Sequence, residues 1–207
     1  EALAGKRAAL GDAHPSTLTS INNLGMLLQD QGRLDEAQPL LEEALAGRRA
    51  ALGDAHPDTL TSINNLGGLL QDQGRLDEAQ PLYEEALAGK RAALGDAHPS
   101  TLASIGNLGE LLHLQGQLDE ARSLLEEALA GSSAALGDAH PSTLNVRCKF
   151  GMLLADAGAL EEALPLVEGA LAGIRLARGE EHPHVRKFAK GLEELRCRRA
   201  AQGQPEQ

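Results

Sequence analysis

Histidine is the residue type that first suggests chemistry in this chain, because its imidazole ring binds metals and transfers protons. Five histidines, each followed by proline, recur at a constant spacing of 42 residues: His14, His56, His98, His140 and His182. If a helical hairpin separates successive copies, at about 10 Å per helix, they cannot share an ion with bonds near ~2 Å. His184 makes the one close pair, with His182, and has no further ligands beside it. We therefore predict no metal site and interpret each His-Pro as the start of a helix, where proline suits the first turn.

Other reactive residue types also favour a structural role. Asp35 and Glu36 form an acidic pair that returns in every repeat. The pair stands at a predicted helix start, where the helix dipole stabilises acids. Cys148 is interpreted as an unreactive thiol. The sequence contains no G-x-S-x-G, P-loop or H-E-x-x-H pattern, so we predict neither an enzyme nor a cofactor.

Composition limits the fold and the partners. Hydrophobic residues make up 42% of the chain but aromatic residues only 1%, so leucine and alanine must build the core. Both are strong helix formers, and the chain is predicted to be all-α. A net charge of −11 argues against nucleic acid. No apolar run approaches the roughly 18 residues that span a bilayer. Two cysteines without a C-x-x-C pair favour a reducing compartment, and we predict a cytoplasmic protein.

The hexapeptide Leu10–Pro15 is one copy of a segment that returns every 42 residues. A fixed period of this size is typical of a repeat array. Between His14 and Ala55 the apolar residues recur at helical spacing in two stretches, 15–31 and 34–52. Glycines end both stretches, so each repeat is predicted to be a helix–turn–helix hairpin.

This pattern resembles the tetratricopeptide repeat (TPR), whose usual unit has 34 residues. The extra length, with Leu-Gly-x-x-His-Pro between units and Asn-Asn-Leu-Gly in the first helix, is similar to the kinesin light chain form of the repeat. The resemblance implies a right-handed α-α superhelix, a TPR solenoid of antiparallel helix hairpins. The packing positions of the family appear as Ile21, Leu24, Gly25, Leu28, Ala37, Leu41 and Ala44.

Glycine in the second helix departs from the family pattern, which usually has an aliphatic residue there. A glycine in a helix interior costs about 1 kcal/mol relative to alanine. The second helices are therefore expected to be either locally weak or unusually close-packed. The four positions are Gly47, Gly89, Gly131 and Gly173.

The repeat period predicts one solenoid over residues 1–202. Because residues 1–7 copy Glu43–Arg49, we expect a piece of a longer protein, with an exposed apolar side that gives weak end-to-end self-association. We predict that the last segment, 182–202, is a lone capping helix, because Glu193 occupies the position of the packing glycine. The predicted parts are a partial second helix at 1–13, full repeats at 14–55, 56–97, 98–139 and 140–181, the capping helix at 182–202 and a disordered tail at 203–207.

First-helix residues that do not pack are expected to line the concave groove of the superhelix. Asn23, Asn65 and Asn107 share one position in successive repeats. An asparagine amide both donates and accepts hydrogen bonds, and the TPR resemblance implies that such a row holds the backbone of an extended peptide. The alternative is a solvated polar face. The predicted groove residues are Asn22, Asn23, Met26, Asn64, Asn65, Asn107, Glu110, His113, Lys149, Lys187 and Lys190.

Basic residues gather near the C-terminal end of this predicted groove. Lys149 replaces asparagine in the row, and residues 183–202 hold six basic residues against two acidic ones. The gradient would orient a peptide with an acidic segment. A capping helix with solvated lysines explains the same residues equally well.

These observations together predict a protein–protein interaction scaffold without catalytic activity. The leading hypothesis is groove binding of a peptide or partner protein, as in the cargo recognition of kinesin light chains. A sensor or regulatory array of a larger signalling protein and a structural spacer remain alternatives. Neither nucleic acid nor a membrane is an expected partner.

Overall fold

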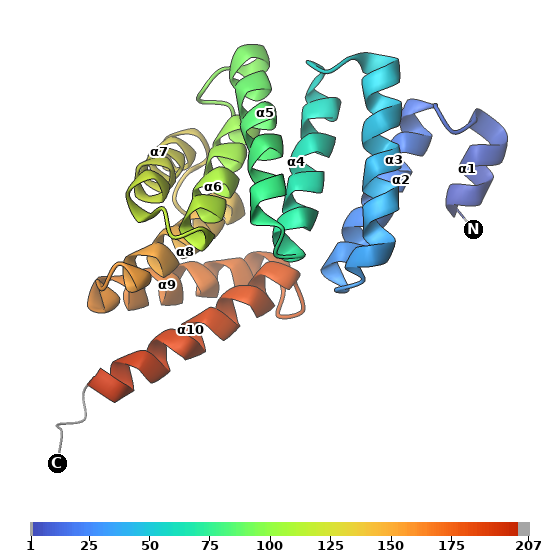
Figure 1. Cartoon of the computed structure of the whole chain (residues 1–207). Helices are drawn as coiled ribbons and strands as arrows, with labels where there is room; N and C mark the ends of the chain where they lie inside the picture. The colour runs from blue at the N-terminus through green and yellow to red at the C-terminus, as the bar shows by residue number, and fades with distance from the viewer. Residues whose placement is uncertain (1, 203–207) are drawn as a thin grey trace. The chain divides into compact units, whose positions relative to one another are not determined.

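The computed structural model describes residues 2–202, and within this range the chain forms ten α-helices and no strand. The predicted all-α class of antiparallel helix hairpins is confirmed (Figure 1). The expected disordered tail, 203–207, lies outside the described residues. The helices are α1 Ala2–Leu10, α2 Pro15–Asp30, α3 Leu34–Leu52, α4 Pro57–Asp72, α5 Leu76–Leu94, α6 Pro99–Leu114, α7 Leu118–Leu136, α8 Pro141–Asp156, α9 Leu160–Arg178 and α10 Pro183–Gln202.

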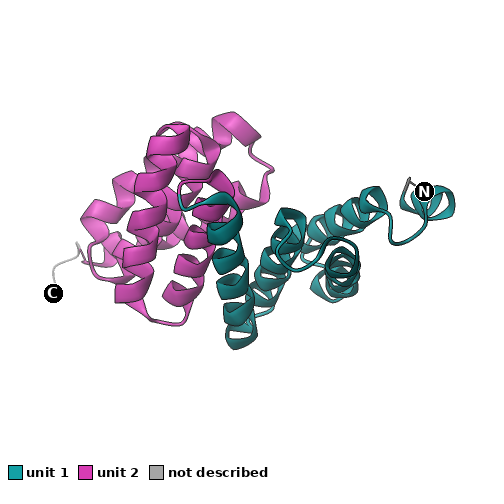
Figure 2. Ribbon diagram, turned by 90° about the horizontal axis from the view of Figure 1, so that it is seen from above, with its two compact units in different colours: residues 1–96 teal, residues 97–207 magenta. Residues whose placement is uncertain are grey.

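The helices form two compact units, residues 1–96 and 97–207 (Figure 2). In unit 1 the hairpins α2/α3 and α4/α5 pack through α3 and α4, and α1 lies against α2. In unit 2 the hairpins α6/α7 and α8/α9 pack through α7 and α8, while α10 lies on α9 and α8. The assignment of 1–202 to one solenoid stays a prediction.

Each His-Pro pair begins a first helix, as the sequence predicts. The histidine is the residue before the first turn, and its Nδ1 accepts a hydrogen bond from the backbone N–H two residues later, which satisfies one of the free donors of a helix start. This distance is 3.2 Å between His14 and Ser16 and 3.1 Å between His98 and Ser100. The same contact occurs at His56, His140 and His182.

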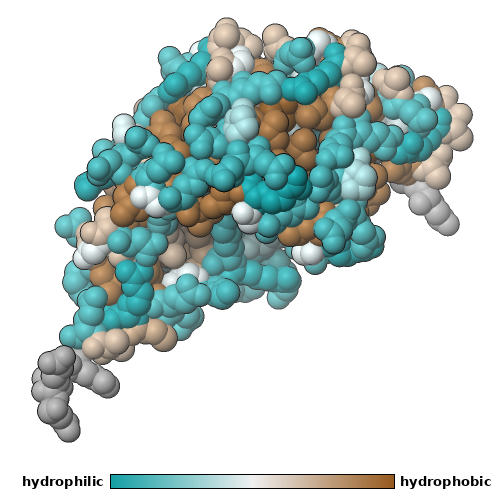
Figure 3. Space-filling view, viewed as in Figure 1, coloured by the Kyte–Doolittle hydropathy of each residue, from teal (hydrophilic) through white to brown (hydrophobic). Residues whose placement is uncertain are grey.

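Leucine and alanine build the core of each unit. In the second hairpin of unit 2, a cluster from α8, α9 and α10 includes Leu171, Phe188 and Leu195, all with at most 4% of their surface exposed. Figure 3 shows hydrophilic side chains covering much of one face, with hydrophobic residues visible between them. No helix between residues 2 and 202 has the length and apolarity that crossing a bilayer requires.

The mid-helix glycines are close-packed, which is one of the two outcomes expected from the sequence. A Cβ atom built at Gly47 would collide with Leu18 of the preceding first helix. The same contact would arise between Gly131 and Leu102, and at Gly173 the nearest atom, Leu144 Cδ1, would lie 2.5 Å away. The missing side chain therefore lets the two helices of a hairpin approach closely.

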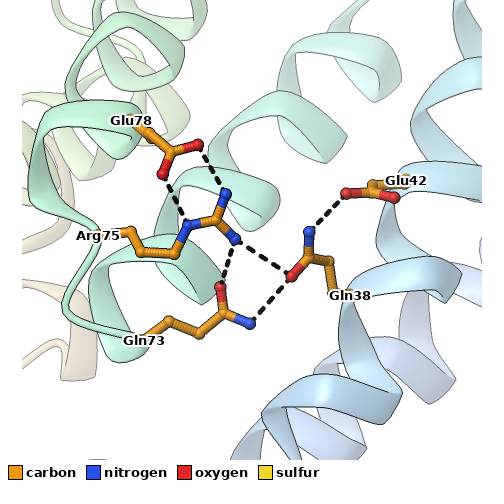
Figure 4. Close-up of polar contacts among 5 residues, drawn as sticks. All are labelled: Gln38, Glu42, Gln73, Arg75 and Glu78. Atoms are coloured by element: carbon orange, nitrogen blue, oxygen red, sulfur yellow. Dashed lines mark hydrogen bonds and ion pairs between the residues drawn. The ribbon is translucent and has the colours of Figure 1, made fainter.

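Polar side chains join the turns of adjacent hairpins in unit 1 (Figure 4). Gln73 Nε2 donates to Gln38 Oε1 at 3.0 Å, and Gln38 Nε2 donates to Glu42 at 2.8 Å. Arg75 bonds Glu78 through both Nε and Nη2, at 2.8 and 2.6 Å. Gln38 of α3 is therefore bonded to the α4/α5 turn, because Arg75 Nη1 also donates to its Oε1, at 3.3 Å.

The last helix buries one side and presents charge on the other. Val185, Phe188, Leu192 and Leu195 pack inward, and none exposes more than 4% of its surface. A Cβ at Gly191 would lie 2.8 Å from Met152 Cε of α8. Helix α10 therefore lies against Met152 of α8 at a glycine two residues before Glu193.

Candidate peptide-binding surface

The predicted binding residues lie on the first helices, which are α2 and α4 in unit 1 and α6, α8 and α10 in unit 2. In each unit we call the side that carries them the first-helix face of that unit. In unit 1, Asn65 Nδ2 donates to Asn22 Oδ1 at 3.1 Å, which links α4 to α2. Further along the same two helices, Gln29 Nε2 donates to Asp72 Oδ2 at 2.6 Å. The amides of this face are therefore partly used between repeats, while Asn23 is exposed and Met26 and Asn64 are half-buried.

A tyrosine lies close to position 68, where repeat two has glycine and repeat one has Met26. Tyr83 of α5 is buried, and its hydroxyl donates to Gln71 Oε1 at 3.1 Å. A Cβ at Gly68 would already lie 3.5 Å from that hydroxyl. The Tyr83 hydroxyl therefore lies at van der Waals distance from position 68, beside the glycine that replaces methionine.

In unit 2 the first-helix face holds an ionic network centred on Glu110. The Lys149 ammonium lies 2.8 Å from Glu110 Oε2 and donates to Asn107 Oδ1 at 2.7 Å. The Lys187 ammonium lies 2.7 Å from Glu110 Oε1. Burial of Glu110 opposes ionisation, but these two cations outweigh it and hold the pKa of the carboxyl well below its ordinary value.

A second polar link joins α6, α8 and α10 in the same unit. His113 Nε2 and Asp156 Oδ2 lie 2.9 Å apart, and Arg198 Nη1 lies 2.7 Å from Asp156 Oδ1. Arg198 Nη2 also donates to the carbonyl oxygen of Ala155 at 2.7 Å. Asp156 keeps a lowered pKa although its burial acts in the opposite direction, because both partners bond its charged form.

The structure therefore divides the predicted binding residues into two groups. Asn23, Lys187 and Lys190 are exposed, whereas the others are half-buried or buried. Lys149 has only 8% of its side chain exposed. It is an internal partner of Glu110, and this pairing is the contact that sequence reasoning missed. One signal was present in the sequence: Lys149, Lys187 and Glu110 are charged, whereas the equivalent positions of the other full repeats are all uncharged.

The chemistry available at this face is binding rather than group transfer. The thiol of Cys148 is fully buried, and burial raises its pKa to about 12, which leaves it protonated and unreactive. Among residues 2–202 no group of three or more His, Cys, Asp or Glu side chains is placed to hold a metal ion. Amides, ammonium groups and carboxylates are the groups that this face presents.

Comparison with known proteins agrees with the helical repeats. A family profile described as "Tetratricopeptide repeat" matches residues 1–50, 16–92, 58–134 and 100–175. A crystal structure of a putative kinesin light chain with nearly identical TPR-like repeats, from Podosopora anserina, is 31% identical over 91% of this chain and 89% of its own, with a TM-score of 0.67. No curated protein matches the chain.

Two more distant crystal structures share the fold. BtubC (BKLC) from P. vanneervenii is 22% identical, with a TM-score of 0.66 over 99% of this chain and 92% of its own. A Rap protein complexed with competence and sporulation factor is 16% identical, with a TM-score of 0.61 over 97% of this chain and 57% of its own.

Proposed function

The chain belongs to the tetratricopeptide repeat family, a scaffold that typically mediates protein–protein interaction, and from this premise we propose that its first-helix face binds an extended peptide segment of a partner protein. Its 42-residue repeats are of the kinesin light chain type, which favours an adaptor that holds a cargo protein. TPR proteins of this type are generally non-enzymatic. The likeness to a Rap protein complexed with competence and sporulation factor supports the idea that this fold accommodates a bound partner.

Repetition of one amide at the same position of successive first helices is the observation that carries the proposal. Asn23, Asn65 and Asn107 occupy the same position of three repeats. An amide that donates and accepts can bond the peptide backbone, whose groups repeat along an extended chain whatever its side chains are. Asn23 is exposed and Asn65 and Asn107 are half-buried, so none of the three residues is wholly enclosed by the chain.

The ionic network changes which residues would select an acidic ligand. Because Lys149 is enclosed between Asn107 and Glu110, it positions these neighbours and does not contact the ligand itself. Lys187 is exposed but shares Glu110, and Lys190 is exposed on the same helix. We therefore assign the preference for an acidic segment to Lys187 and Lys190.

A pull-down with immobilised full-length chain tests the proposal. The triple variant Asn23→Ala, Asn65→Ala and Asn107→Ala is expected to lose partners that the wild type retains, because each alanine removes one donor and one acceptor. The matched control replaces an exposed polar pair within a single second helix, Arg122→Ala and Glu126→Ala of α7, and is expected to retain them. Equal recovery by the triple variant, at an unchanged helical content by circular dichroism, would contradict the proposal.

A cytoplasmic location is part of the same proposal. Both cysteines of the chain are free thiols, which suits a reducing compartment. If the chain instead serves as the regulatory array of a larger signalling protein, the residues flanking it in the full gene product would include a nucleotide-binding or catalytic domain.

A further inference from the structure

An ion pair between successive second helices recurs in unit 1, and we call it the Arg–Glu clasp. Arg7 Nη2 lies 2.8 Å from Glu43 Oε2, and Arg49 Nη2 lies 2.6 Å from Glu85 Oε1. Arg49 also bonds Asp54 in the following turn, with its Nε 3.1 Å from the carboxylate. The clasp therefore covers the outer side of each hairpin where it meets the hairpin before it.

Between the two second helices of unit 2, α7 and α9, both members of this clasp are absent. Ser133 of α7 stands at the arginine position and Gly169 of α9 at the glutamate position. Asp138, the counterpart of Asp54, pairs instead with Arg147, whose Nη2 lies 2.9 Å away. Arg147 in turn replaces an isoleucine that is fully buried in the other three repeats. Three substitutions therefore alter one place in the fold.

These substitutions leave a hollow of about 560 Å³ at the outer side of α9. A Cβ built at Gly173 would lie 2.5 Å from Leu144 Cδ1, whereas a Cβ at Gly169 would have no atom within 4 Å. Gly173 therefore forms part of the floor, and Gly169 opens toward solvent. Apolar residues dominate the lining, which consists of Leu144, Gly169, Gly173, Leu176, Ala177, Ala139 and the Asp138–Arg147 pair.

A protruding leucine stands beside the hollow. Leu176 has 92% of its surface exposed, the highest value among the exposed large hydrophobic residues of the described chain. Alanine occupies the equivalent position in the other three repeats. Transfer of a leucine side chain out of water is favourable, so covering this face with another surface would be stabilising.

The charges around this face are balanced. Glu168 pairs with Arg196 at 3.0 Å, and Arg175 pairs with Glu180 at 3.1 Å. The one acid in the lining of the hollow, Asp138, is paired with Arg147, and Gly169 stands where the clasp has its glutamate. In a chain of net charge −11, two copies repel one another over most of their surface, and this repulsion is weakest at a neutral face.

We infer that the outer face of α9 is a self-association surface whose occupant is a second copy of this chain. The face presents a projecting leucine and an apolar hollow side by side. In a two-fold dimer the same patch meets itself, so Leu176 of each copy enters the hollow of the other. The inference goes beyond peptide binding by the first-helix face and rests on different residues, because it uses a second helix.

Sedimentation velocity of the full chain across a range of concentrations tests the inference. The wild type is expected to shift from the mass of one copy toward that of two copies as concentration rises. Leu176→Ala is expected to weaken this association by about tenfold or more, since it removes a central anchor of the interface. Added salt is expected to strengthen the wild-type association, because it screens the repulsion between two acidic chains.

The double variant Ser133→Arg and Gly169→Glu is the matched control for folding. It restores the clasp found in unit 1, so its unfolding temperature is expected to stay at or above the wild-type value. The same variant fills the mouth of the hollow with charge and is expected to remain a single copy. A wild type that stays a single copy at the highest concentration overturns the inference. That result is expected if the face instead binds an apolar segment of another protein. The inference is also overturned if the Leu176→Ala variant dimerises as strongly as the wild type. Equal dimerisation is expected if the chain associates through its N-terminal end.

Discussion

One repeat position carries a buried cation in some copies and a neutral residue in others. Arg48 and Lys90 occupy it in the first two repeats, each with at most 5% of its surface exposed. Arg48 Nη1 donates to Ser62 Oγ at 2.8 Å and to the carbonyl oxygen of Asp58 at 3.0 Å, so its charge is solvated by the hairpin that follows. Burial lowers the pKa of both side chains, that of Lys90 to about 8, because a low-dielectric interior disfavours the charged form.

Lys90 makes the stability of the protein depend on pH in the alkaline range. The folded state gives up this proton near pH 8, while the unfolded chain holds it up to an ordinary pKa of 10.5. Between these values the unfolded state binds more protons, so the free energy of unfolding should rise with pH, by at most about 3 kcal/mol. Urea denaturation of the wild type between pH 7 and pH 10 measures this rise, against Lys90→Met as the control, in which the contribution of this side chain is absent. A wild-type curve that falls in parallel with that of the variant would contradict the assignment.

Close approach of the two helices in a hairpin depends on glycine at some positions and not at others. Gly131 and Gly169 both lie inside second helices of unit 2. A Cβ at Gly131 would collide with Leu102, whereas Gly169 faces open space. Helix propensity favours alanine at both positions by about 1 kcal/mol, so packing decides the sign of the effect.

The two glycine-to-alanine substitutions should therefore act in opposite directions. Gly131→Ala is expected to destabilise the protein by about 1–3 kcal/mol, because the added methyl group overfills the contact with Leu102. Gly169→Ala is expected to stabilise it by up to about 1 kcal/mol, since only the propensity changes. Thermal unfolding followed by circular dichroism measures both. Equal shifts in the same direction would show that packing at Gly131 has no influence.

The helices were predictable from sequence because their signals are local. The 42-residue period, the apolar spacing and the His-Pro starts predict hairpins at 15–31 and 34–52, and the helices span 15–30 and 34–52. The two outcomes left open for the mid-helix glycines could not be separated by the sequence, because the answer depends on Leu102 and its counterparts in another helix. The pairing of Lys149 and Lys187 with Glu110 was missed for the same reason, as it joins residues 39 to 77 positions apart. The binding residues themselves stay a prediction.

At the scale of the whole molecule, each hairpin depends chiefly on its neighbours, as expected for stacked repeats. In unit 2 the core cluster of the last hairpin is completed by Val185, Phe188 and Leu192 of α10. This helix covers apolar side chains of α8 and α9 that would otherwise meet water. A change in α10 should therefore lower the stability of the adjacent hairpin, α8/α9, more than that of the other hairpins.

Removing residues 183–207 tests this dependence. Amide exchange in α8 and α9 is expected to accelerate, because their side chains lose the cover of α10. Exchange in α2 and α3 is expected to stay at the wild-type rate, and these helices serve as the internal control. Hydrogen exchange followed by mass spectrometry measures both. Uniform acceleration throughout the chain would instead indicate a single cooperative folding unit.

Repeats one and two differ at a pair of neighbouring positions, one on each helix of the hairpin, and this affects how the gene can recombine. The first helix has Met26 or Gly68, and the second helix has Leu41 or Tyr83. Repeats one and two are nearly identical, so their coding segments are prone to recombine with one another. A crossover between hairpins keeps each first helix with its own second helix, and the packing survives. A crossover inside a hairpin would combine methionine with tyrosine, which places a long side chain against the Tyr83 hydroxyl, or glycine with leucine, which leaves neither side chain there. Whole hairpins are therefore the units that this chain can duplicate or exchange without loss of stability.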